Sequence, residues 1–149
     1  MEGYNNGFKD LMERGRLQKK MYKYKKGVEI VRAIYCFEKA VKLCPDDVTA
    51  RYELADCWLE FGGPDSVKKA IEYFEPTFNI SRETATEYAD MLAQRRMNVE
   101  DPVGARKLWR LIMEYNPEDS FERKNAKKNV EELTELINQG RFRTPTMMR

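Results

Sequence analysis

Two segments of the chain carry the same spacing of alanine, aromatic and proline residues. Residues 33–47 read AIYCFEKAVKLCPDD, and residues 105–119 read ARKLWRLIMEYNPED. The matching positions are Ala33, Phe37, Ala40, Leu43 and Pro45 in the first segment, and Ala105, Trp109, Ile112, Tyr115 and Pro117 in the second. Spacings of three and four residues place these positions on one face of a helix. Proline then ends the helix, because it forces the preceding residue out of helical geometry.

The distance between the two copies indicates a repeat. Pro45 and Pro117 lie 72 residues apart, which is twice a period of about 36 and within the range of two-helix repeats. A third copy is expected between them. Residues 70–80 keep the offsets but lack the final proline, with Ala70, Phe74, Thr77 and Ile80 at the matching positions. The small residues let helices approach closely and the rings fill the gaps between layers, so we expect all of them in the core.

Helices are expected along the rest of the chain as well. Apolar residues recur at helical spacing in segments 10–26, 28–44, 46–61, 64–80, 82–96, 103–116 and 120–138. Pro76 is expected to kink or end its helix early. In segment 10–26 the expected inward stripe is Leu17, Met21 and Tyr24. No segment alternates polar and apolar residues with period two, so the predicted fold class is all-α.

This arrangement resembles the tetratricopeptide repeat (TPR) family. The first helix of that repeat carries a leucine, a small residue and an aromatic, as in Leu54, Ala55 and Trp58, and the second helix carries the pattern quoted above. The resemblance covers residues 14–138 and implies an α-α superhelix of about three helical hairpins plus a C-terminal capping helix. Residues 1–13 are then an N-terminal extension and residues 139–149 a basic C-terminal tail. The related half-a-TPR repeats of RNA-processing factors are suggested by residues 105–117 alone.

The resemblance also implies where a partner would bind. In this family the first helices of successive repeats line a concave groove. Here the groove would present Gln18 and Lys25 with Tyr22, Tyr52, Glu53, Asp56, Glu60, Glu83, Glu87 and Asp90. Six of these residues are acids, which favours a basic partner segment, extended or helical. The alternative is that the acids keep an exposed face soluble.

Positive charge is concentrated at the two ends of the chain. Residues 1–32 hold nine Lys or Arg and four acids, and residues 139–149 hold three Arg and no acid, although the net charge is only +2. The segment RLQKKMYKYKKG interleaves tyrosines with lysines, a combination that can bind phosphates and stack on bases. The alternative is an ordinary solvated helix face. The candidate basic contacts are Lys19, Lys20, Lys23, Lys25, Lys26, Arg141 and Arg143.

Catalytic and metal-binding patterns are absent from the sequence. The chain has no histidine, which excludes Ser-His and Cys-His pairs, and it has no glycine-rich phosphate loop. Its three cysteines, Cys36, Cys44 and Cys57, lack metal-binding spacing, and we expect reduced, mostly buried thiols. We therefore expect no enzymatic activity, no cofactor and no metal site.

Localisation follows from two further patterns. No run approaches the roughly 18 consecutive apolar residues of a membrane span, and the N-terminus lacks the apolar core of a secretory signal. We expect an intracellular protein, cytoplasmic by default, with a mitochondrial location left open. The predicted function is a non-enzymatic protein–protein interaction scaffold, an adaptor or structural subunit of a larger assembly. The alternative is an RNA-associated helical-repeat protein that uses its basic N-terminal helix.

Overall fold

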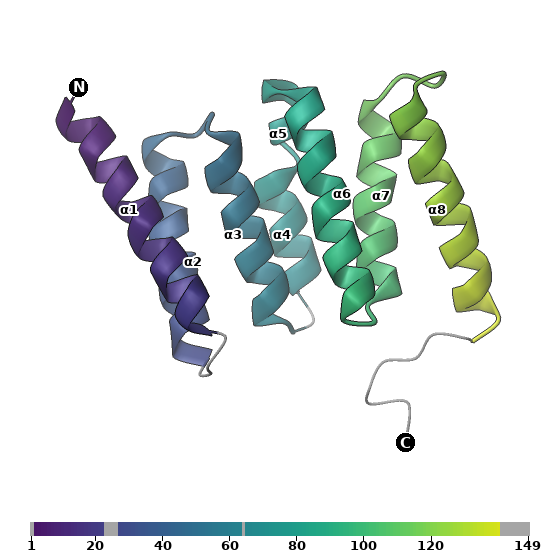
Figure 1. The fold of residues 1–149 in the computed structure, drawn as a ribbon, viewed down its shortest axis with the longest axis horizontal. Coiled ribbons are helices and arrows are strands. Elements are labelled where there is room, and N and C mark those ends of the chain that lie inside the picture. Colours follow the sequence, from purple (N-terminus) through teal and green to yellow (C-terminus); the bar gives the residue numbers. More distant parts are fainter. Residues whose placement is uncertain (1, 23–26, 64, 141–149) are drawn as a thin grey trace. The chain divides into compact units, whose positions relative to one another are not determined.

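The computed structural model describes residues 2–22, 27–63 and 65–140, with the side chains of residues 2–6 left out. Helices make up the regular structure of these ranges, and no strand occurs in them, which confirms the predicted all-α class. The chain forms two compact units, residues 1–80 and residues 81–149. Figure 1 shows the helices of both units.

The first unit contains five helices among its described residues: α1 (Glu2–Met21), α2 (Gly27–Leu43), α3 (Val48–Phe61), α4 (Ser66–Phe74) and α5 (Thr77–Ile80). Helix α1 packs against α2, α2 against α3 and α3 against α4, and the direction of the chain reverses at each of these steps (Figure 1). The most extensive contacts of this unit therefore join helices that are neighbours in the sequence, while the short helix α5 contacts α3.

The helices of this unit end where the sequence predicts. Helix α2 stops at Leu43, two residues before Pro45, and α3 stops at Phe61, where Gly62 takes a positive φ of 76°. Pro76 lies between α4 and α5, which confirms the predicted break. The side chain of Asp47 accepts a hydrogen bond from the amide of Ala50 at 2.8 Å and so caps the start of α3.

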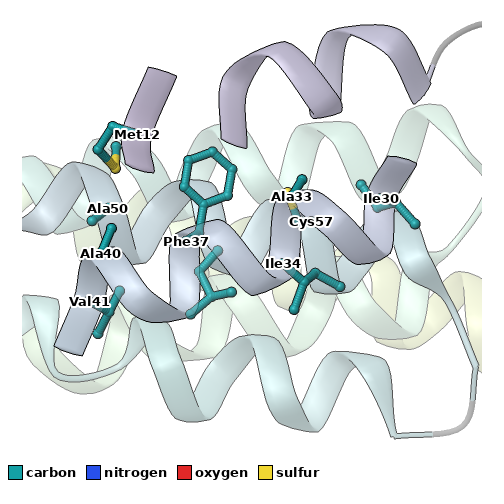
Figure 2. Packing of buried hydrophobic residues seen from close by; sticks show 10 residues of the cluster. Met12, Ile30, Ala33, Ile34, Phe37, Ala40, Val41, Ala50 and Cys57 are labelled. Carbon is teal, nitrogen blue, oxygen red and sulfur yellow. The ribbon is translucent and has the colours of Figure 1, made fainter. Parts of the chain in front are cut away.

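The core of the first unit is built on the predicted face of α2. Ala33, Phe37 and Ala40 are fully buried. Figure 2 shows ten side chains of this core, with the Phe37 ring pointing from α2 toward α1. On α1 the ring meets Gly15, where a β-carbon would lie only 2.6 Å from two ring atoms. The absence of a side chain at Gly15 is therefore what allows α1 to pack closely on α2.

The inward stripe predicted for the first helix is wrong. Leu17 is 56% exposed and Met21 is 45% exposed, while Tyr24 lies outside the described residues. The face that contacts the core carries Met12 and Gly15, with Phe8 and Leu11 packed beside it. Successive residues turn by about 100° around a helix, so Leu17, two positions after Gly15, faces nearly the opposite way. Helix α1 begins at Glu2, so residues 2–13 belong to the same helix as Gly15.

The second unit contains three helices among its described residues: α6 (Arg82–Asn98), α7 (Pro102–Tyr115) and α8 (Phe121–Asn138). Helix α7 packs against both α6 and α8. Asp101 caps α7 through a 3.0 Å hydrogen bond from the amide of Gly104, and Ser120 caps α8 through a 3.1 Å hydrogen bond from the amide of Arg123. Most of the positions expected to face inward are buried, namely Ala85, Ala89, Leu92, Ala105, Trp109, Ile112, Ala126, Val130 and Leu133, whereas Tyr88, Tyr115 and Ile137 are half-buried.

Among the described residues, no helix is both long enough and apolar enough to cross a membrane.

Candidate functional site

A pocket of about 430 Å³ lies within the second unit, formed by the first half of α6, the C-terminal half of α7 and the start of α8. Its floor is apolar and its rim is charged. The residues that line it are Arg82, Glu83, Thr86, Glu87, Asp90, Trp109, Ile112, Asn116, Pro117, Ser120, Phe121, Glu122, Asn125 and Ala126. Pockets of this size are typical of sites that hold a small molecule or a side chain of a partner.

Three of the predicted groove acids line this pocket. Glu83, Glu87 and Asp90 stand at spacings of four and three on α6, so they share one face of the helix. Glu122 adds a fourth carboxylate from α8, and Arg82 is the cation at the rim. Glu83, Glu87 and Glu122 are exposed, and none of the three makes a side-chain hydrogen bond or ion pair within the described part of the chain. The pocket therefore has a marked excess of negative charge.

A tryptophan ring is fixed at the base of the pocket. Trp109 is 4% exposed, and its indole Nε1 donates a hydrogen bond to Asp90 Oδ1 at 2.9 Å. This bond joins α7 to α6 and satisfies the only polar group of the ring. It also holds the Asp90 carboxylate in one position at the pocket wall.

A buried asparagine stands between the helices at the same place. Asn116 is 7% exposed, and its Nδ2 donates hydrogen bonds to Thr86 Oγ1 and to the Ile112 carbonyl, both at 2.9 Å. A carbonyl only accepts, so the nitrogen of the amide must face Ile112. The other end of the amide, Oδ1, is an acceptor, and no donor among the described residues bonds to it.

An aromatic ring stands exposed at the mouth of the pocket. Phe121 is the first residue of α8, directly after the Ser120 cap, and it is 76% exposed. It lies off the buried stripe of its helix, whose members are Ala126, Val130 and Leu133. An exposed phenylalanine beside carboxylates combines an apolar surface with a concentration of negative charge.

In the first unit the predicted groove acids meet a lysine of the same chain. The Nζ atom of Lys19 on α1 lies 2.5 Å from Glu53 Oε1 and 2.5 Å from Asp56 Oδ2, both on α3. Arg16 Nε also lies 3.1 Å from Glu53 Oε2. Asp56 is 1% exposed, so this group of charges is largely inside the protein. Burial by itself lowers the pKa of Lys19, but the charges of Asp56 and Glu53 outweigh it and raise that pKa above its ordinary value of 10.5.

The aromatic residues predicted for the same groove lie beside this Lys19 cluster, defined as Lys19, Glu53 and Asp56. Tyr52 is buried, and the Lys19 ammonium lies 5.6 Å from the centre of its ring. The Tyr22 hydroxyl donates a hydrogen bond to the Glu60 carbonyl at 3.5 Å. Tyr22, Tyr52, Glu53, Asp56 and Glu60 are thus brought together, but mostly in contacts within the chain.

The predicted basic contacts have different outcomes. Lys19 is held by two carboxylates, whereas Lys20 is exposed. Lys23, Lys25, Lys26, Arg141 and Arg143 lie outside the described residues.

The pocket residues that sequence reasoning missed include Asn116, Phe121 and Glu122. The exposure of Phe121 could have been predicted from the sequence, because a ring that lies outside the apolar stripe of its helix is expected on the surface. No sequence pattern predicts that Asn116 and Glu122 line the pocket, since only the packing of α6, α7 and α8 brings them there.

Within the described ranges, no group of three or more His, Cys, Asp or Glu side chains is placed to hold a metal ion. The three thiols are free, Cys57 is buried, and Cys36 and Cys44 are half-buried. Burial raises the pKa of both Cys57 and Cys36, which makes these thiols less reactive.

Comparison with known proteins adds no family to these observations: no model of a known protein family matches the chain, and no curated protein matches its sequence.

Proposed function

We propose that this chain is a non-enzymatic protein–protein interaction scaffold, an adaptor or structural subunit of a larger assembly, and that the second-unit pocket binds a basic segment of its partner. The observation that carries this proposal is the placement of Glu83, Glu87, Asp90 and Glu122 around one concave site beside the exposed ring of Phe121.

Charge supports a basic partner. Four carboxylates and one arginine leave the pocket with a net charge of about −3, and a concave site of one sign attracts and orients the opposite charge. The acids of the first unit contribute less, because Glu53 and Asp56 are already paired with Lys19. We therefore assign partner recognition to α6, α7 and α8.

Architecture supports a scaffold. Helices added one beside another, with small residues and rings buried at the repeated offsets, suit a protein that presents surfaces to others. We propose on the same grounds that the helices form TPR-like hairpins ending in a capping helix. The buried alanines Ala33, Ala70 and Ala105, each followed four residues later by a buried ring, are the support for this.

The test is affinity purification from the native source, with and without nuclease, using the full chain and two charge variants. Glu83→Gln with Glu87→Gln removes two carboxylates from the pocket. The matched control, Glu131→Gln with Glu135→Gln, removes two exposed carboxylates at the same spacing on α8, away from this pocket.

We expect a set of nuclease-resistant protein partners that is retained by the control variant and lost by the pocket variant. Equal recovery with both variants contradicts the assignment of the pocket. Loss of every partner on nuclease treatment contradicts the scaffold function and favours an RNA-associated protein instead.

A further inference from the structure

The unsatisfied polar groups of the second-unit pocket are mostly acceptors. The carboxylates of Glu83, Glu87 and Glu122 make no side-chain hydrogen bond within the described residues. The two donors at the base are already used, since Trp109 Nε1 bonds to Asp90 and Asn116 Nδ2 bonds to Thr86 and Ile112. Of the other donors, Arg82 and Asn125 are at exposed positions, the Ser120 hydroxyl donates to the Pro117 carbonyl, and the Thr86 hydroxyl is a donor as well as the acceptor of Asn116. The base and the acidic wall therefore suit a ligand that brings several donors.

The buried amide of Asn116 indicates the same ligand independently of the acids. More than nine-tenths of this residue is buried, it lines the pocket, and Oδ1 has no donor among the described residues. Asn116 Oδ1 is not one of the fully buried side-chain atoms that lack a partner, so this acceptor keeps some accessible surface and can receive a hydrogen bond. A donor carried into the pocket by a ligand would supply that hydrogen bond.

Two rings complete the site. Trp109 lies at the base and Phe121 at the mouth, and the 76% exposure of Phe121 leaves its faces open to a ligand. Cations are attracted to the faces of aromatic rings, and a guanidinium group also stacks on them because it is planar.

We propose that the pocket is selective for arginine and binds one arginine side chain of the partner segment. The guanidinium hydrogen-bonds to the carboxylates of Glu83 and Glu87 and to Asn116 Oδ1, and the side chain lies against Phe121. This inference rests on the proposed function, since it names the side chain that the partner inserts.

Arginine fits these groups better than lysine does. A guanidinium has five N–H donors in a rigid plane, is more weakly hydrated and can bond to a carboxylate through two parallel hydrogen bonds. A lysine ammonium has three donors, carries a compact hydration shell and cannot stack on a ring.

The experiment measures binding of three capped tripeptides to the full chain by NMR titration. The tripeptides are Gly-Arg-Gly, Gly-Lys-Gly and Gly-citrulline-Gly, and citrulline keeps the shape of arginine without its charge. The indole N–H signal of Trp109 is the reporter, assigned by its persistence in a Trp58→Phe variant. We expect the arginine tripeptide to bind at least about fivefold more tightly than the lysine tripeptide, and the citrulline tripeptide to leave the signal unmoved.

Variants test the residues. Phe121→Ala removes an exposed ring and is expected to weaken arginine binding by about three- to tenfold, while Glu83→Gln with Glu87→Gln is expected to abolish it. The control Glu131→Gln with Glu135→Gln is expected to bind as the wild type does. Preserved binding by the Phe121 and Glu83/Glu87 variants overturns the inference.

The outcomes separate this inference from the proposed function. Equal binding of the arginine and lysine tripeptides, or binding of neither, overturns arginine selectivity. The scaffold function would still stand in either case if the Glu83/Glu87 variant lost its nuclease-resistant partners in the purification described above.

Discussion

The ring of Phe37 on α2 lies directly against Gly15 on α1. A β-carbon at residue 15 would come within 2.6 Å of Cε1 and Cζ of that ring, a distance that real contacts do not reach. Phe37 has no exposed surface and cannot turn aside without moving other core side chains. The closeness of α1 and α2 therefore depends on the missing side chain at Gly15.

Replacing this glycine should destabilise the first unit. Alanine favours a helix over glycine by about 1 kcal/mol, whereas overpacking the ring in Gly15→Ala should cost about 1–3 kcal/mol. The expected net change is a loss of up to about 2 kcal/mol. The free energy of unfolding can be measured in urea through the fluorescence of Trp58, which lies in the first unit, in a Trp109→Phe background.

Gly7 on the same helix is the matched control for Gly15. A β-carbon at Gly7 would lie 3.9 Å from Leu43 Cδ1, an ordinary van der Waals distance. Gly7→Ala should therefore leave stability unchanged or raise it by up to about 1 kcal/mol. If Gly15→Ala proved as stable as Gly7→Ala, the close packing of α1 on Phe37 would be disproved.

Removing the charge of Lys19 should be more harmful than removing that of its neighbour. Lys19→Met leaves Glu53 and the buried Asp56 without the ammonium that lies 2.5 Å from each, and breaking a buried pair costs about 3 kcal/mol. Lys20→Met removes an exposed charge and should change stability by less than about 0.5 kcal/mol. Urea denaturation of the two variants compares them, and equal stabilities would show that the Lys19 cluster adds nothing.

The contribution of Lys19 should decrease under alkaline conditions. Its pKa is raised in the folded protein because the charges of Asp56 and Glu53 outweigh the effect of burial. A raised pKa means that the folded state holds the proton more tightly, so the stabilisation is fully present below the ordinary pKa of 10.5 and is lost as pH rises through the folded pKa. The difference in unfolding free energy between wild type and Lys19→Met should stay constant from neutral pH up to about pH 10.5 and shrink above it. A difference that shrinks already near neutral pH would contradict this assignment.

The Cys57 thiol should resist modification in the native protein. The side chain is fully buried, and burial raises its pKa, so little of the reactive thiolate forms. Iodoacetamide at mildly alkaline pH should label Cys57 only after denaturant is added, whereas the half-buried Cys44 should be labelled without it. Peptide mapping by mass spectrometry distinguishes the two, and labelling of Cys57 as fast as Cys44 would contradict the buried position.

The sequence predicts the core of α2 and α7 well because helical spacing alone defines that face. Ala33, Phe37 and Ala105 are buried as the repeat pattern predicts. The register of α1 could not be found in the same way. Hydrophobic periodicity selected Leu17 and Met21, but the packed face is defined by Gly15, which has no side chain for such a pattern to detect.

The candidate site was only partly predictable for a related reason. Glu83, Glu87 and Asp90 share a helix face, so their grouping follows from spacing. Asn116, at the end of α7, and Glu122, on α8, line the same pocket. The periodicity of a single helix cannot predict that residues of different helices come together. The pairing of Asp56 with a lysine on another helix is likewise a product of tertiary packing.

The Lys19 cluster has a consequence for the order in which the first unit folds. The bond between Lys19 and Glu53 spans 34 residues of chain, whereas the packing of α1 on α2 and of α2 on α3 joins neighbouring helices. Contacts between distant residues form only after the intervening chain has lost its conformational freedom. We expect the packing of α1 on α2 and of α2 on α3 to be present in the transition state and the Lys19 cluster to form after it. Lys19→Met should then accelerate unfolding while leaving the folding rate nearly unchanged.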